Sequence, residues 1–83
     1  MKLAKYVKFR EEKFGGVLFE TRSEKVFTLN QTGAAVVREI GVGDDESSIV
    51  ERLKEHFHDP DAAIEREMLA FIADLKHKGL VEN

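Results

Sequence analysis

Cysteine is absent from this chain of 83 residues. Its absence excludes disulfides, thiolate zinc sites, iron–sulfur ligation and a cysteine nucleophile, and it is compatible with a reducing compartment. No apolar run approaches the roughly 20 residues that a membrane-spanning helix needs. Lys5, Lys8 and Arg10 interrupt the apolar segment that a secretory signal would require near the N-terminus. The sequence therefore predicts a soluble cytoplasmic protein with no membrane partner.

The length limits the chain to one small domain, which we assign to residues 1–83. A domain of this size buries only about 60% of the surface of its extended chain, which leaves one core and no room for a deep active site. Charge is unevenly spread, because residues 1–27 hold seven lysines and arginines against four glutamates while the whole chain carries a net charge of −3. A basic first third joined to an acidic remainder favours polar selection of a partner over nucleic-acid binding.

Three short strands are predicted in the first third of the chain, over Tyr6–Lys13, Val17–Glu20 and Lys25–Leu29. Gly15 and Gly16, between the first two strands, indicate a hairpin turn because glycine adopts positive φ without a Cβ clash. Short connections favour antiparallel pairing of neighbouring strands. We therefore predict a three-stranded antiparallel meander.

Helices are predicted after the strands. Asn30 is a good N-cap for a first helix over Gln31–Ile40, because its side-chain oxygen can accept from a free backbone N–H of the first turn. The second helix is expected to start within Asp44–Ser48, where Ser48 and Glu51 have the spacing of a capping box.

The third helix is predicted to be the longest and to start at Asp59 and Pro60, a capping carboxylate followed by proline at the first helical position. Its apolar residues at helical spacing are Ile64, Met68, Phe71, Ile72 and Leu75. Together the elements predict an α+β, winged-helix-like fold, in which a three-stranded antiparallel meander is followed by three helices.

The edges of the predicted sheet differ in charge. The first strand is dense in lysine, arginine and glutamate, which discourage another strand from pairing. The third strand has Val26–Leu29 behind the single charge of Lys25, so this edge is open to an added strand unless a helix covers it. The alternative is that Val26–Leu29 is only a core strand.

An apolar strip beside the core stripe of the third helix is a second candidate surface. At about 100° per residue, Ile72 lies at the margin of the core stripe and Leu69 falls beyond it. Glu65 and Lys76 flank these two residues on the same side. Such a strip suits a peptide groove, although Leu69 can equally be one exposed leucine.

Residues typical of catalysis or metal binding are poorly placed. His56 and His58 are two apart and would not share a helical face. The glycines of residues 41–43 follow a helix and precede three acids, unlike a phosphate loop. Ser47 and Ser48 have no base in a recognisable arrangement. We therefore expect a non-catalytic protein with no metal and no cofactor.

Several short motifs occur in an order that is typical of one family. They are the basic meander, the acidic turn before Ser48, and the segments Leu29-Asn30-Gln31-Thr32-Gly33, Ile49-Leu53-Phe57 and Phe71-Ile72-Leu75-Lys78-Gly79-Leu80-Val81. In these features, over nearly its whole length, the chain resembles the PqqD-like family. Family members are similar to winged-helix domains and act as recognition elements and peptide chaperones for ribosomally made peptides. They bind the leader of a precursor and present its core to a modifying enzyme, often a radical-SAM protein.

The resemblance implies that a leader peptide adds as a further strand beside Val26–Leu29 and packs against the third helix. A peptide bound in this way gains affinity from main-chain hydrogen bonds and specificity from alternate side-chain pockets. The helical side chains are our own inference from the apolar strip. The expected site is Val26, Phe27, Thr28, Leu29, Leu69, Ile72 and Lys76.

Two other functions stay open. A winged-helix DNA-binding protein needs a basic recognition helix, whereas residues 61–78 hold four acids against three lysines and arginines. A structural accessory subunit could pair its open strand edge with its own copy. The sequence also leaves open whether the pathway is PQQ biosynthesis or another radical-SAM peptide pathway.

Overall fold

A computed structural model describes residues 1–43, 45–57 and 62–82. The elements in chain order are β1 (Lys2–Leu3), β2 (Val7–Glu12), β3 (Gly15–Glu20), β4 (Lys25–Leu29), α1 (Gln31–Ile40), α2 (Glu46–His56), α3 (Ala63–His77) and β5 (Val81–Glu82). Strands β2, β3 and β4 form an antiparallel sheet in that order. The predicted α+β class, with a three-stranded meander followed by three helices, is confirmed.

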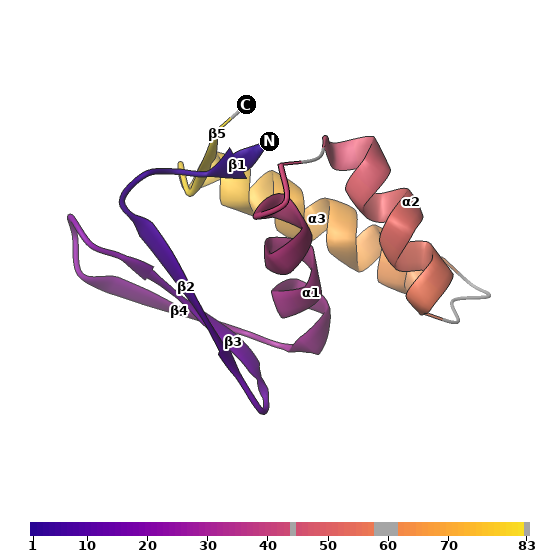
Figure 1. Cartoon of the computed structure of the whole chain (residues 1–83), viewed down its shortest axis with the longest axis horizontal. Coiled ribbons are helices and arrows are strands. Elements are labelled where there is room, and N and C mark those ends of the chain that lie inside the picture. The colour runs from indigo at the N-terminus through magenta and orange to yellow at the C-terminus, as the bar shows by residue number, and fades with distance from the viewer. Residues whose placement is uncertain (44, 58–61, 83) are drawn as a thin grey trace.

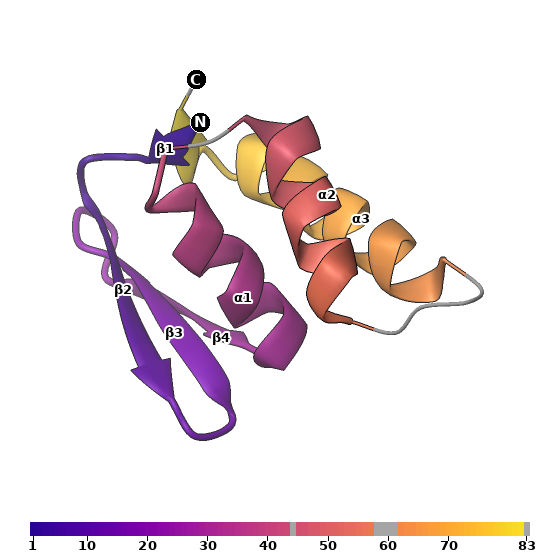
Figure 2. The same ribbon diagram turned by 45° about the vertical axis from the view of Figure 1, so that its right-hand side comes forward.

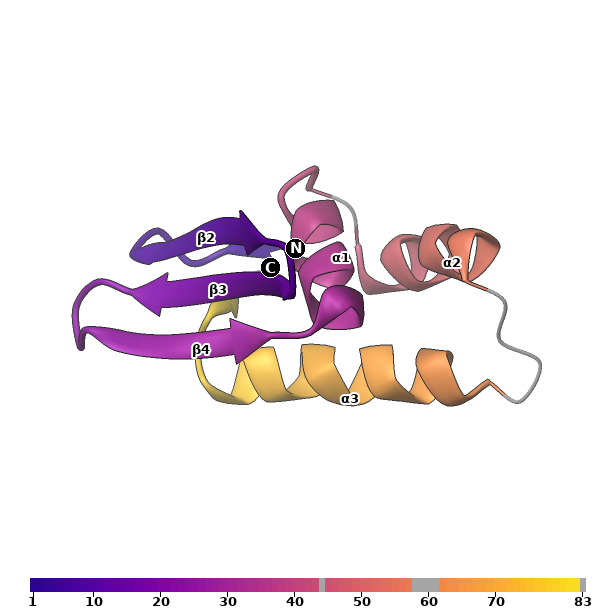
Figure 3. The same ribbon diagram turned by 90° about the horizontal axis from the view of Figure 1, so that it is seen from below.

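The helices lie on one side of the sheet and beyond one of its edges. Figure 2 shows α1 between the sheet and α2, and Figure 3 shows α3 running beside β4. The largest fully buried side chains come from β3, all three helices and the chain that follows α3: Leu18, Val36, Val37, Ile40, Ile49, Met68, Ile72, Leu75 and Leu80. Burial of each larger side chain contributes about 1.5–3 kcal/mol. None of the described helices is long and apolar enough to cross a bilayer.

The turn between β2 and β3 differs from the prediction. Lys13 and Phe14 make the turn, whereas Gly15 and Gly16 are the first residues of β3. Gly15 has φ of +147°, and a Cβ there would lie 2.2 Å from the carbonyl oxygen of Leu29. Glycine is therefore required because β3 passes against the end of β4, and not because the chain reverses at this residue.

The start of α1 agrees with the prediction, and α2 starts at Glu46, within the predicted Asp44–Ser48, but with a different cap. Asn30 caps α1, and its Oδ1 accepts from the N–H of Gly33 at 2.8 Å. Asp45, rather than Ser48, caps α2, and its carboxylate accepts from the backbone N–H of Ser48 at 2.8 Å. This bond lowers the pKa of Asp45 below its usual range because it favours the charged form.

The start predicted for the third helix, at Asp59 and Pro60, lies outside the described residues. Among those that are described, α3 begins at Ala63 after Ala62, which has a positive φ of 56° and no side-chain cap. Of the five apolar residues predicted to repeat along this helix, Met68, Ile72 and Leu75 are buried, and Ile64 and Phe71 are partly buried.

A small second sheet joins the two ends of the described chain (Figure 1). Strand β1 pairs antiparallel with β5, so that Leu3 faces Val81. Leu80, just before β5, is buried. The sequence patterns described above do not predict this pairing of the C-terminal residues with the N-terminal ones.

We expect Gly15→Ala to lower the free energy of unfolding by about 2–4 kcal/mol, because it combines an unfavourable φ with overpacking. Gly79→Ala is the matched control, since Gly79 also has positive φ (+73°) but a Cβ there meets no atom within 4 Å. The control should lose only about 1 kcal/mol. Urea unfolding measures both values, and equal losses would show that contact with the end of β4 is unimportant.

Candidate functional site

Strand β4 is an edge strand whose only described partner is β3. In the neighbouring β2–β3 pairing, the N–H of Thr21 donates to the carbonyl oxygen of Tyr6 at 2.8 Å. Backbone N–H and C=O groups alternate in direction along an antiparallel strand. Because the N–H of Thr21 points to β2, the backbone groups of the odd-numbered residues of β3 point to β2, and those of the even-numbered residues point to β4. Their partners in β4 are Lys25, Phe27 and Leu29. The N–H and C=O groups of Val26 and Thr28 therefore point away from the sheet, toward the open edge.

The turn before β4 is held by side-chain contacts. The carboxylate of Glu20 accepts from the hydroxyl of Ser23 at 2.5 Å and from the backbone N–H groups of Arg22 and Ser23. These bonds, chiefly the hydroxyl one, lower the pKa of Glu20. Arg22 also lies over the ring of Tyr6, 3.5 Å from its centroid. The start of the open strand is thus fixed before any partner binds.

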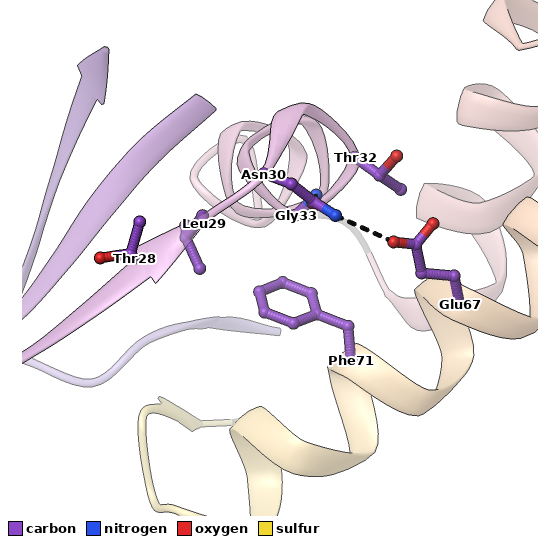
Figure 4. Close-up of a pocket in the computed structure, with 7 residues that line it drawn as sticks. All are labelled: Thr28, Leu29, Asn30, Thr32, Gly33, Glu67 and Phe71. Atoms are coloured by element: carbon purple, nitrogen blue, oxygen red, sulfur yellow. Dashed lines mark hydrogen bonds between the residues drawn. The ribbon is translucent and has the colours of Figure 1, made fainter. Parts of the chain in front are cut away.

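Two adjacent pockets lie between β4 and α3, and we call this region the β4–α3 groove. Both pockets are lined by Thr28, Leu29 and Phe71, and these side chains therefore lie where the two pockets meet. Figure 4 shows the residues of the first pocket. The first has a volume of about 320 Å³ and is lined by Thr28, Leu29, Asn30, Thr32, Gly33, Glu67 and Phe71. The second, of about 420 Å³, is lined by Leu18, Val26, Phe27, Thr28, Leu29, Phe71, Asp74, Leu75, Lys78 and Leu80.

One hydrogen bond crosses the groove at the end nearest α1. The side-chain amide of Asn30 donates to Oε1 of Glu67 at 3.0 Å, as Figure 4 shows. The same side chain caps α1 through its oxygen. A Cβ on Gly33 would lie 3.3 Å from this oxygen and 3.5 Å from Cζ of Phe71. The absence of a side chain at Gly33 therefore leaves space for the cap and for the phenyl ring together.

The opposite end of the groove carries a cation and an acid. Lys78 forms an ion pair with Asp74 one turn earlier on α3. Its Nζ also lies 5.8 Å from the ring centroid of Phe27, within the range of a cation–π contact. The groove thus combines an apolar middle at Phe71 with charged groups at both ends, which suits a peptide of mixed polarity.

The helical residues predicted for the site lie elsewhere. Ile72 is fully buried. Leu69 is exposed, but it lines a pocket with residues of α2, including Val50. Lys76 donates to Glu46 of α2 at 3.0 Å. The structure therefore brings Val26–Leu29 together with a wall of α3, but Leu69, Ile72 and Lys76 are not part of that wall.

The difference follows from the rotation of α3 about its axis. At about 100° per residue, Glu67, Phe71, Asp74 and Lys78 fall on one flank of the buried stripe, and Glu65, Leu69 and Lys76 fall on the other. The first flank faces β4 and the second faces α2. The spacing of both flanks is visible in the sequence, but periodicity alone does not tell which flank meets the sheet.

Histidine and carboxylate side chains are the groups of this chain that could hold a metal ion. Within the part of the chain that is described, no group of three or more histidine, aspartate or glutamate side chains is placed to hold a metal ion. His58, one of the two histidines considered from the sequence, lies outside the described residues. The lowered pKa values of Glu20 and Asp45 belong to a turn and a helix cap.

Comparison with known proteins gives one family and two solved structures. The family model described as coenzyme PQQ synthesis protein D (PqqD) matches residues 15–81. TbiB1, solved in complex with the TbiA(beta) leader peptide, is 22% identical with a TM-score of 0.84, over 100% of this chain and 96% of that one. Lasso peptide synthetase B1, complexed with the leader peptide, is 23% identical with a TM-score of 0.79, and the match covers 99% of this chain and 96% of that one. At such identity the likeness shows a shared fold. No curated protein matches the chain.

We expect Asn30→Ala to lower the free energy of unfolding by about 1 kcal/mol, because it removes the cap of α1. Glu67→Ala removes only the exposed partner across the groove and should change stability by less than about 0.5 kcal/mol. Chemical denaturation of both variants measures the difference. A loss that is as large for Glu67→Ala would mean that the bond across the groove, rather than the cap, holds this corner.

Proposed function

The chain belongs to the PqqD family, and from this premise we propose that it binds the leader of a ribosomally made precursor peptide and presents it to a peptide-modifying enzyme. The observation that carries the proposal is the open edge of β4 above the β4–α3 groove. The two similar structures are both complexes with leader peptides, which supports the same use of this fold.

The leader adds to the sheet as a strand beside β4. Its backbone hydrogen-bonds to the outward N–H and C=O groups of Val26 and Thr28, which gives affinity without much dependence on sequence. Its alternate side chains, about 7 Å apart on one face of the strand, enter the pockets on either side of Phe71 and give specificity. The interface between the leader and the chain would be small, and we expect a dissociation constant between about 10 μM and tens of nM.

The chain acts as a binding protein, and the chemistry belongs to its partner. We propose a radical-SAM enzyme as that partner, because this is what the family resemblance implies. The cytoplasm is the proposed location, as expected from the sequence composition. The identity of the precursor decides whether the product is PQQ or another peptide-derived compound. The groove has an apolar middle and charged ends, so it selects a peptide segment of matching pattern and does not need a metal or a cofactor.

A DNA-binding role gains no support from α3. Its two C-terminal lysines are engaged, Lys76 with Glu46 and Lys78 with Asp74. Phosphate contacts need cations that can leave their partners, and this helix would present glutamate and aspartate beside them. The leader peptide therefore remains the partner that the geometry supports best.

We expect Thr28→Pro to weaken leader binding at least about tenfold, because proline removes an outward N–H of the edge strand. Thr28→Val is the matched control, since it keeps the N–H and nearly the same shape. It should bind within about threefold of the wild type. Fluorescence anisotropy with a labelled leader peptide, encoded near the gene of this chain, measures both affinities.

Circular dichroism must first show that Thr28→Pro is folded. A folded Thr28→Pro protein with unchanged affinity would contradict strand addition at β4. Size-exclusion chromatography of the free protein tests the other use of the edge, in which two copies pair through β4. A stable dimer that the leader does not dissociate would favour a structural subunit.

A second pair of variants tests the wall of the groove. Phe71→Ala removes the ring between the two pockets and should weaken leader binding about tenfold or more. Leu69→Ala truncates an exposed side chain on the opposite flank of the same helix and should leave affinity within about twofold. If Leu69→Ala weakened binding and Phe71→Ala did not, the peptide would lie on the α2 side of α3, as the sequence alone suggests.

A further inference from the structure

The face of the sheet that points away from α1 is apolar at its centre, and we call it the outer face. Cross-strand register places Lys8, Phe19 and Val26 in one row across β2, β3 and β4, with Arg10 and Val17 in the next. Val26 is 60% exposed and Phe19 36%. A shallow pocket of about 410 Å³ lies among these side chains. Figure 1 shows that no helix of the described chain covers this face.

The fold itself does not need these apolar side chains. The uncovered face of an antiparallel sheet is usually polar, and the core is closed on the other face by Leu18, at the centre of β3. A phenylalanine and two valines gathered on an uncovered sheet face form a patch of the kind that marks an interaction site. Such a patch also exposes the protein to aggregation, so a partner that covers it removes a liability.

Lysines without a partner gather in the same part of the molecule. Among the described residues, the lysines with neither an ion pair nor a side-chain hydrogen bond are Lys5, Lys8, Lys13 and Lys25. All four lie in or beside the sheet, whereas every described lysine and arginine of the helices has a partner. Of these four, Lys8 lies on the outer face itself, opposite Phe19 in the pairing of β2 with β3, and a free lysine beside an apolar patch complements an acidic group on the molecule that covers it.

The outer face is continuous with the β4–α3 groove. Val26 lines both the pocket of the outer face and the second pocket of the groove. A leader strand beside β4 would widen the outer face by one strand, and its outward side chains would stand next to Val26 and Thr28. A protein that covers this face would therefore touch both the sheet and the bound leader.

We propose that the outer face is the docking surface for the peptide-modifying enzyme, which binds it through an apolar patch bordered by acidic side chains. The inference rests on the proposed function, because it assigns a surface to the partner named there. A second copy of the chain is a poorer occupant, since symmetric packing of two outer faces would bring their unpaired Lys8 side chains together.

The test compares two glutamate substitutions at exposed apolar residues. Phe19→Glu places a negative charge at the centre of the patch, where it would repel the acidic border of the enzyme. It should weaken binding of the purified modifying enzyme, which is encoded beside the gene of this chain, at least about tenfold. Val42→Glu is the control with the same net charge change, at a residue that is 67% exposed in the turn after α1. It should stay within about twofold of the wild type. Isothermal titration calorimetry measures both.

Lys8→Glu is a second test of the outer face, for the case in which Phe19→Glu does not fold. It reverses one exposed lysine and should weaken enzyme binding about threefold to tenfold, with less loss at high salt. Leader affinity is measured on the same proteins and should be unchanged in every variant. If the wild type fails to bind the leader, the proposed function fails; if only enzyme binding is insensitive to Phe19→Glu and Lys8→Glu, the docking surface alone is overturned.

The last arm of the test uses vesicles of neutral lipid that contain about 30% anionic lipid, so that their surface charge is roughly physiological. The account predicts no cosedimentation of the wild type with them. Cosedimentation that Phe19→Glu abolishes, with enzyme affinity unchanged, would overturn the proposal and make the outer face a membrane-binding surface.

Discussion

Two hydrogen bonds of the Asn30 side chain hold the corner on which the groove depends. Its oxygen accepts from Gly33 at the start of α1, and its amide donates to Glu67 of α3. The first bond ends β4 and directs the chain into α1. The second links this corner to α3 across the groove. A single side chain thus connects the end of the strand, the start of the helix and the far wall, so the corner is already formed in the free protein, which would lower the ordering cost of the proposed peptide binding.

The open edge of β4 costs the free protein little, because water satisfies its outward backbone groups. Binding exchanges these hydrogen bonds for others of similar strength, so the backbone gives a modest net gain. In the proposed complex, affinity for one peptide over another would then depend on the side chains that enter the pockets beside Phe71. The other edge, β2, is dense in charge and has Arg10 paired with Glu12, which disfavours an added strand. The sheet therefore presents one edge, and not the other, that is suited to an added strand.

Local signals in the sequence predict most of the fold. The strand patterns, the short connections and the Asn30 cap are sufficient for the meander and its turn into α1. The same signals misplace the glycine turn, since the need for glycine at Gly15 comes from the carbonyl oxygen of Leu29, fourteen residues away in the chain. Pairing of β1 with β5 joins the two ends of the described chain, and two-residue strands carry too little pattern to predict it.

In the candidate site, too, one part is predicted by local sequence signals and the other depends on contacts between residues distant in sequence. Val26–Leu29 are recognisable as an open edge from composition, whereas the facing wall depends on how α3 is rotated against the sheet. Hydrophobic periodicity defines the buried stripe of Met68, Ile72 and Leu75, but it treats the two flanks of that stripe alike. Packing against α1, α2 and the sheet decides between them, and these contacts are distant in sequence.

The most direct test of the central claim is an isotope-filtered nuclear Overhauser experiment on the labelled protein with unlabelled leader peptide. Strand addition predicts contacts between peptide backbone protons and the Val26 and Thr28 amides, together with contacts from peptide side chains to the Phe71 ring. Saturable binding with contacts only at Leu69 and Lys76, and none along β4, would contradict it.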